Sequence, residues 1–251
     1  MSTWIFLRGL TRESRHWGDF PAAFRDAIPD AEVITLDLPG NGRLNRMRSP
    51  GSVAAMAEHC RVELAARGIR PPFRLLAMSL GAMVAVAWAA AHAQEIERCV
   101  LINTSLRPFN PFYRRLRPTS YATLLGLALP CRSAEAHEEA ILRLTSALAG
   151  NRAQTVEAWS AWRREHPVAR ANALRQLWAA SRYRAPARKP AVPMLILAGA
   201  GDALVDPRCS RRLTHVWQAD FAEHPAAGHD LPLDDGPWIA RQVRDWLQRR
   251  G

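Results

Sequence analysis

Residues 73–88 constrain the fold of this chain more than any other stretch. The first six, Phe-Arg-Leu-Leu-Ala-Met, read as a short buried strand, and an Ala-rich apolar helix follows Ser79. Small residues stand two places before and after the serine, at Ala77 and Gly81. A serine hydroxyl on a tight strand-to-helix turn needs small neighbours, and the helix N-terminus supplies N–H groups where an oxyanion would form. We therefore expect Ser79 to be a nucleophile.

Apolar runs alternate with helical segments along the rest of the chain. Buried strands are expected at residues 4–7, 33–36, 73–78, 98–102 and 194–198, with a weaker one at 219–223. Helices are expected at residues 14–27, 52–67, 80–91, 207–216 and 238–249, the first capped by Ser14. Such alternation is typical of a parallel sheet with helices on both faces. We predict an α/β fold with a doubly wound, mostly parallel sheet.

The character of the sequence changes between residues 106 and 188, where strand signals disappear and Arg, Ala, Leu and Trp dominate. We expect residues 106–188 to form an inserted helical cap and residues 1–105 and 189–251 to form the core. Cap helices are expected at residues 121–129, 133–149, 153–165 and 168–183. Helical spacing predicts that their apolar faces are packed in the interior, through Trp159, Trp162, Leu174, Leu177 and Trp178.

Two further polar residues are expected at the same edge of the sheet as Ser79. Asp202 follows the strand at 194–198, and His229 lies in the loop after the last expected strand. The carboxyl ends of parallel strands share one edge, where doubly wound proteins build their sites. In such a set the histidine takes the proton of the serine, and the aspartate holds the imidazole in one tautomer.

Other acids and histidines compete for these roles. Asp206, Asp230 and Asp234 are alternatives to Asp202, although Asp206 precedes Pro207 and fits a helix N-cap. The remaining histidines are interpreted as surface or packing residues: His16, His59, His92, His137, His166, His215 and His224.

Four motifs stand in order along the expected core: Arg8-Gly9-Leu10, Asp37-Leu-Pro-Gly-x-Gly42, Ala77-x-Ser79-x-Gly81, and the paired Gly199-x-x-Asp202 and Ala227-Gly-His229. Through them the chain resembles the α/β-hydrolase superfamily, in the branch with a helical cap, over about residues 3–105 and 190–250. The order Ser, Asp, His is also that of the family. The resemblance implies an α/β-hydrolase fold, a triad of Ser79, Asp202 and His229, and an oxyanion hole made by the backbone N–H groups of Leu10 and Leu80.

Arg8 departs from the family pattern, which usually has a histidine before the glycine. The oxyanion donor is a backbone group, so the hole is compatible with Arg8. The side chain would pair with an acid such as Glu13 or Asp37, or bind an anionic group of the substrate. The candidate substrate-binding residues are Arg8, Met78, Trp159 and Trp162.

The resemblance implies a serine hydrolase that cleaves a carboxylic ester or thioester through an acyl-enzyme, without a metal or a cofactor. The chain is similar to carboxylesterases of the pimeloyl-acyl-carrier-protein methyl ester type, which dock an acidic carrier protein on a basic cap. Such a partner would be attracted here by Arg114, Arg115, Arg117, Arg132, Arg143, Arg163 and Arg164. Acyl transfer and C–C bond hydrolysis fit the same residues, and a non-catalytic binding module on a hydrolase fold is the alternative from another class.

The net charge of the chain bears on its binding partners, and its cysteine content bears on its cellular compartment. The formal charge of +11 comes from arginine, since Lys189 is the only lysine, but the arginines are interleaved with acids and predict no nucleic-acid partner. Four cysteines, without a Cys-x-x-Cys pair, predict reduced packing residues and a cytoplasmic protein: Cys60, Cys99, Cys131 and Cys209. The longest apolar stretch, residues 80–91, is too short to span a membrane, and no signal peptide is expected.

Overall fold

The computed structural model describes residues 1–128 and 133–250. Six strands form one parallel sheet in the order β2-β1-β3-β4-β5-β6. Their bounds are β1 Ser2–Leu7, β2 Ala31–Leu36, β3 Phe73–Met78, β4 Ile96–Ile102, β5 Met194–Gly199 and β6 Asp220–His224. In the centre of the sheet, Ile5 of β1 is in register with Ile34 of β2 and Leu75 of β3. Every expected strand is present, so the predicted α/β class is confirmed.

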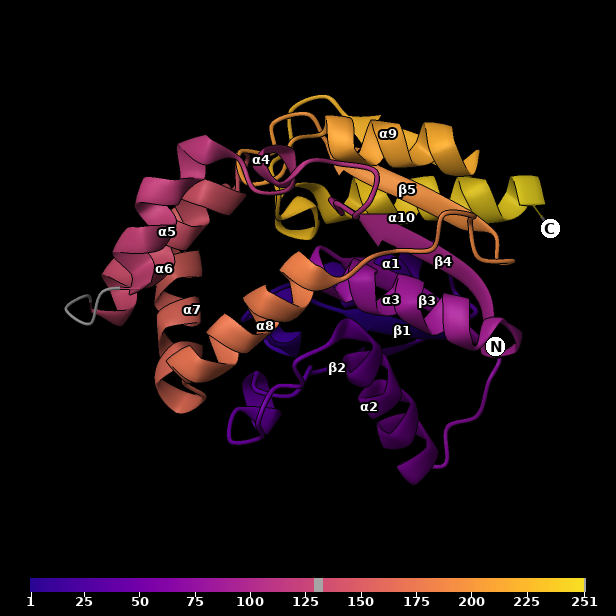
Figure 1. Cartoon of the computed structure of the whole chain (residues 1–251), viewed down its shortest axis with the longest axis horizontal. Helices are drawn as coiled ribbons and strands as arrows, with labels where there is room; N and C mark the ends of the chain where they lie inside the picture. Colours follow the sequence, from indigo (N-terminus) through magenta and orange to yellow (C-terminus); the bar gives the residue numbers. More distant parts are fainter. Residues whose placement is uncertain (129–132, 251) are drawn as a thin grey trace.

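Helices cover both faces of this sheet (Figure 1). One face packs against α2 (Val53–Ala66), α3 (Leu80–Ala91) and α9 (Arg208–Trp217), and the other against α1 (Phe20–Ala27) and α10 (Leu231–Arg250). Because successive side chains of a strand point to opposite faces, Ile5 joins the first core and its neighbour Phe6 joins the second. The doubly wound architecture is therefore confirmed.

Three helices differ clearly from expectation, one of them the cap helix expected at residues 133–149, which ends at Thr145. The helix expected from Ser14 is two helices, a 3-10 turn η1 (Ser14–Trp17) with Glu13 as its N-cap, and then α1. Gly18 separates them with φ of 53°, a left-handed conformation that glycine tolerates better than other residues. The last helix begins at Leu231 and contains a break at Asp235, whose φ is −154° and ψ is 73°. The apolar periodicity of the sequence predicts neither the separation at Gly18 nor the break at Asp235.

Between β4 and β5 the described residues form helices and loops, with one isolated bridge between Arg107 and Arg184. The helices are α4 Phe112–Arg115, η4 Pro118–Ser120, α5 Tyr121–Ala128, α6 Ala134–Thr145, α7 Arg152–Glu165 and α8 Arg170–Arg182. In Figure 1, α5, α6 and α7 stand to one side of the sheet, and α8 leads back toward it. We propose the division made from the sequence, a core of residues 1–105 and 189–251 and a cap of residues 106–188.

The expected burial of apolar cap residues is right for Trp159, which is 3% exposed, and wrong for three residues of α8. Leu174, Leu177 and Trp178 are 66%, 47% and 58% exposed. The face of α8 that packs inward carries polar and small residues instead: Asn172, Gln176, Ala179 and Ala180. Asn172 and Gln176 form hydrogen bonds with backbone and side-chain groups of the loops after β1 and β2, so amides rather than leucines are buried there.

Candidate active site

Ser79 lies on the turn between β3 and α3 with φ of 55° and ψ of −115°, a conformation that non-glycine residues rarely adopt. Gly81 allows this turn, because a Cβ at that position would lie 2.3 Å from the Leu7 carbonyl oxygen. The backbone N–H of Ser79 donates to the Ile102 carbonyl at 3.0 Å, which attaches the turn to β4. The Ser79 hydroxyl is half-buried and makes no hydrogen bond to any described residue. No hydrogen bond to a described residue therefore fixes the hydroxyl, and the backbone turn sets the position of the side chain.

The loop after β1 passes next to the serine. A Cβ on Gly9 would lie 3.2 Å from the Cβ of Ser79, which places the Gly9 backbone in contact with that side chain. Leu10 follows this glycine, and its N–H has no hydrogen-bond partner within the described residues. Leu80 follows Ser79 as the first residue of α3, where the helix leaves its N–H groups unpaired. Of the two expected oxyanion donors, Leu80 therefore follows Ser79 directly, and Leu10 follows the glycine whose backbone contacts the Ser79 side chain.

Asp202 and His229 face each other from the loops after β5 and β6. The Asp202 Oδ2 and His229 Nδ1 atoms are 2.7 Å apart, and the two residues are 1% and 3% exposed. A carboxylate only accepts hydrogen bonds, so Nδ1 carries the proton and Nε2 is left as the acceptor. The other carboxylate oxygen, Oδ1, accepts from the N–H groups of Leu204 and Val205, both at 2.8 Å. The imidazole is thereby held in one tautomer.

Asn103 is a site residue that sequence analysis missed. It follows β4, between the strands that lead to Ser79 and Asp202, and it is 2% exposed. Its Nδ2 donates to the carbonyls of Gly228 at 3.0 Å and His229 at 2.8 Å, and its Oδ1 accepts from the Gly199 N–H at 2.9 Å. The signal in the sequence was a polar residue directly after an apolar run, the position that Ser79 occupies after β3.

Arg8 pairs with neither of the acids expected for it. Its Nη1 and Nη2 atoms donate to Oδ1 and Oδ2 of Asp230 at 3.0 and 2.6 Å, and the guanidinium lies 4.8 Å from the centre of the Trp17 ring. Asp37 accepts instead from the N–H and hydroxyl of Ser14, each at 2.7 Å. The partner of Arg8 is distant in sequence but adjacent to His229. Contact between Arg8 and a substrate stays a prediction.

The other acids near the site also have their own partners. Asp206 accepts from the backbone N–H of Arg208 at 3.0 Å and pairs with its guanidinium at 2.6 Å. Asp234 accepts from the Ser146 hydroxyl at 2.5 Å and from the Gly228 N–H at 2.6 Å. Asp234 therefore attaches the cap to the loop that carries His229.

The remaining candidate substrate-binding residues lie in protein contacts. Met78 ends β3 directly before Ser79 and is 3% exposed. The rings of Trp159 and Trp162 on α7 lie 5.3 and 5.2 Å from that of His16, and the Arg12 guanidinium lies 4.2 Å from the centre of Trp159. These contacts hold the cap against the loop after β1. A substrate contact by Met78, Trp159 or Trp162 stays a prediction.

A second attachment of the cap is made by Gln176 on α8, which is fully buried. Its Oε1 accepts from the Thr11 N–H at 2.9 Å, and its Nε2 donates to Asn41 Oδ1 at 2.8 Å and to Ser49 Oγ at 3.0 Å. Thr11 follows Leu10 in the chain. The position of α8 is therefore linked to the loop that carries one expected oxyanion donor.

Other reactive groups were also considered. Cys60, Cys99 and Cys209 are buried free thiols, and burial raises the pKa of Cys60 and of Cys209 to about 12. Cys131 lies outside the described residues. Within residues 1–128 and 133–250, no three His, Cys, Asp or Glu side chains form a group that could hold a metal ion. No helix of the described chain has the length and apolarity needed to cross a membrane.

The chain is similar to known proteins in both sequence and fold. A family model described as the alpha/beta hydrolase fold matches residues 5–236. The chain is 27% identical to the biotin biosynthesis bifunctional protein BioHC of Teredinibacter turnerae over 274 aligned positions. That match covers 99% of this chain and 45% of the relative, so the chain spans about half the length of the protein it matches.

Solved structures share the fold at low sequence identity. A putative lipase from Acinetobacter baumannii superposes with a TM-score of 0.79 at 20% identity, covering 99% of this chain and 84% of that one. A thermophilic esterase from Thermogutta terrifontis superposes with a TM-score of 0.75 at 19% identity, covering 99% and 90%. At these identities the likeness shows a common fold.

Proposed function

The chain belongs to the α/β-hydrolase fold family and is a hydrolase of that family; from this premise we propose that it cleaves carboxylic esters or thioesters through an acyl-enzyme on Ser79. The observation that carries the proposal is the buried 2.7 Å contact between Asp202 and His229. It lies at the sheet edge where Ser79 occupies its unusual turn. Three groups of complementary chemistry at one edge of a parallel sheet support nucleophilic catalysis.

In the proposed reaction, the Ser79 hydroxyl attacks the acyl carbon and passes its proton to Nε2 of His229. Asp202 stabilises the resulting imidazolium through its hydrogen bond to Nδ1. The N–H groups of Leu10 and Leu80 stabilise the oxyanion of the tetrahedral intermediate. When this intermediate collapses, the alcohol or thiol leaves with the proton from His229. Water, activated by the same histidine, then hydrolyses the ester on Ser79 and restores the hydroxyl.

A fluorophosphonate probe tests the proposal, because it reacts with an activated serine. The wild-type protein should be labelled at neutral pH, and Ser79→Ala should not be labelled although it is folded by circular dichroism. Ser181→Ala, which changes an exposed serine of the cap, should be labelled like the wild type. If the folded wild-type protein is not labelled, the enzymatic proposal is wrong and a non-catalytic binding module is favoured.

An acyl ester linked to an acidic carrier protein is the finer form of this proposal. The net charge of +11 and the resemblance to carboxylesterases that act on carrier-linked esters support it. The cap arginines are less available than their number implies, because Arg143 pairs with Glu139 at 2.7 Å and Arg163 with Glu138 at 3.3 Å. Arg117 donates to the Asp202 carbonyl at 2.8 Å. Arg132 lies outside the described residues.

Rates with a free acyl methyl ester and with the same acyl group on an acidic carrier test this finer form. The carrier-linked ester should be hydrolysed faster at low salt, and the advantage should decrease at high salt, since salt screens attraction between exposed charges. Equal rates for the two esters at both salt concentrations would exclude the carrier but leave the hydrolase proposal intact.

A further inference from the structure

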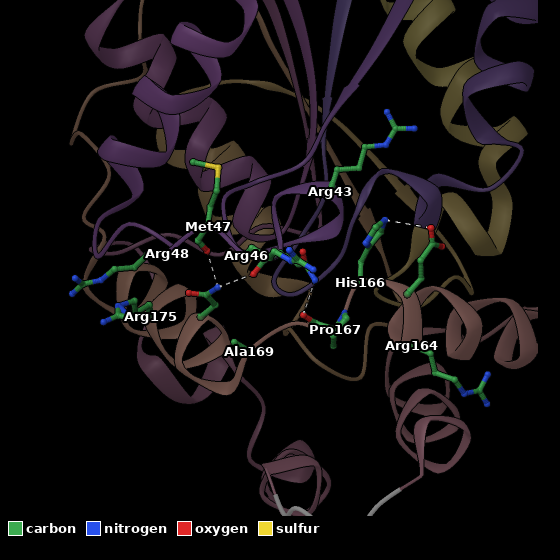
Figure 2. A pocket seen from close by; sticks show the side chains of 12 residues that line it. Arg43, Arg46, Met47, Arg48, Arg164, His166, Pro167, Ala169 and Arg175 are labelled. Carbon is green, nitrogen blue, oxygen red and sulfur yellow. Dashed lines mark hydrogen bonds and ion pairs between the residues drawn. The ribbon is translucent and has the colours of Figure 1, made fainter.

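A cavity of about 960 Å³ opens where the loop after β2 meets the end of α7 and the start of α8 (Figure 2). A single acid, Glu165, lines it. The cavity is also lined by five arginines: Arg43, Arg46, Arg48, Arg164 and Arg175. Neither Ser79, Asp202 nor His229 is among its lining residues. The cavity is therefore distinct from the candidate active site.

Much of the positive charge of this cavity has no ion-pair partner among the described residues. Arg164 forms an ion pair with Glu135, and Glu165 forms an ion pair with Arg15, which does not line the cavity. No carboxylate of a described residue pairs with Arg46, Arg48 or Arg175, and Arg43 interacts with Glu165 only at a distance longer than that of an ion pair. Arg46 and Arg48 are exposed and Arg175 is half-buried, so the charges of these three side chains are available to an anion from solution.

The walls of the cavity are joined by buried hydrogen bonds. Asn172 is 6% exposed; its Oδ1 accepts from the Ser49 N–H at 3.0 Å, and its Nδ2 donates to the Met47 carbonyl at 2.9 Å. Figure 2 shows that the side chains of Arg48 and Arg175 extend in the same direction from these two joined walls. The backbone that carries both arginines is thus fixed before any ligand arrives, which reduces the entropy lost on binding.

We propose that this cavity binds a small, phosphate-bearing anion with at least two negative charges. Guanidinium groups match phosphate oxygens through paired N–H···O bonds, which are stronger than bonds between neutral groups. No Phe, Tyr or Trp lines the cavity, so recognition rests on the anionic groups and not on stacking against a nucleobase. A hollow bounded by the loop after β2, α7 and α8 has room for a small molecule, whereas a stable protein partner needs a broader surface.

Calorimetric titration of the whole chain with pyrophosphate tests the proposal. The pocket variant is Arg46→Gln, Arg48→Gln and Arg175→Gln combined. The control variant is Arg70→Gln, Arg212→Gln and Arg241→Gln combined, which removes the same charge from exposed arginines elsewhere that have no carboxylate partner in the described residues. All three proteins should hydrolyse a neutral ester at the same rate and melt at similar temperatures.

Pyrophosphate should bind the wild type and the control variant alike, and the pocket variant at least about tenfold more weakly, since each lost charge-assisted hydrogen bond weakens binding. Citrate should bind more weakly than pyrophosphate. Equal affinity in both variants, or no binding to the wild type, would overturn the proposal. Tighter binding of citrate would overturn the phosphate assignment. Pocket-dependent binding of a polyglutamate peptide without binding of pyrophosphate would overturn it in favour of an acidic protein partner.

Discussion

Arg8 and Asp230 form a two-point ion pair that is closed off from solvent, with side chains 2% and 3% exposed. Arg8 precedes Gly9, whose backbone contacts Ser79, and Asp230 follows His229. The pair therefore joins the loop expected to carry an oxyanion donor to the loop that carries the candidate base. Burial of the two charges carries a large desolvation penalty. The attraction between them offsets this penalty only while both partners are present.

Removing Asp230 should therefore destabilise the protein strongly. We expect Asp230→Ala to lower the free energy of unfolding by about 3–5 kcal/mol, because Arg8 is left buried without a counter-charge. Urea denaturation measures this change. In the control, Asp245→Ala, an exposed pair with Arg244 is lost, and the change should stay below about 1 kcal/mol. Similar changes in the two variants would contradict the role given to burial.

Asp202→Asn should reduce ester hydrolysis without unfolding the protein. The amide no longer holds His229 in the tautomer that accepts a proton from Ser79, so kcat should fall by about 10³–10⁴-fold. Steady-state kinetics with a chromogenic ester measure the change. Asp206→Asn, whose carboxylate pairs with Arg208, should keep kcat within about threefold of the wild type. A larger loss in Asp206→Asn than in Asp202→Asn would contradict the assignment.

Gln176→Ala tests the link between the cap and the active-site loop. The change leaves the Thr11 N–H without its acceptor, and the free energy of unfolding should fall by about 1–3 kcal/mol. Because Leu10 precedes Thr11, kcat for ester hydrolysis should fall as well. Gln248→Ala, on the exposed face of α10, should change neither quantity. An unchanged kcat in a destabilised Gln176→Ala protein would show that α8 does not position the loop.

Gly81→Ala tests the close approach of α3 to β1. The added Cβ would lie 2.3 Å from the Leu7 carbonyl oxygen, so the turn at Ser79 must shift, and stability should fall by about 1–3 kcal/mol. Gly51→Ala is the matched control, because nothing lies within 4 Å of a Cβ there. Thermal unfolding measures both. If Gly81→Ala is no less stable than Gly51→Ala, the strand and helix are not as close as described.

His16 should make the protein sensitive to acid. Burial, and then the positive charges of Arg12 and Arg8, hold the pKa of this imidazole well below its usual 6.5. The unfolded chain binds a proton as the pH falls through about 6.5 and the folded protein does not, so stability is full above that pH and decreases below it. The slope should be about 1.4 kcal/mol per pH unit for this one group. His16→Phe should reduce the slope measured by urea denaturation between pH 6.5 and 5; an unchanged slope would contradict this account.

The sequence by itself determined the sheet and the position of the proposed chemistry on it. Apolar runs and their alternation with helices predicted every strand, and the carboxyl ends of parallel strands share an edge, so Ser79, Asp202 and His229 were expected together. Of these, the structure joins Asp202 to His229 by a hydrogen bond and places Ser79 on the same edge. A local pattern is sufficient here because strand order follows general rules of topology.

Tertiary structure alone decided which groups pack across from one another. Arg8 and Asp230 are 222 residues apart, and Asn103 reaches Gly228 and His229 across 125 and 126 residues. The apolar spacing of α8 predicted a buried Trp178, yet the helix buries Gln176, because the core loops opposite this residue offer hydrogen-bonding groups. Periodicity records which side of a helix is apolar. The chemistry of the opposite surface, which decides what is buried, exists only after the chain has folded.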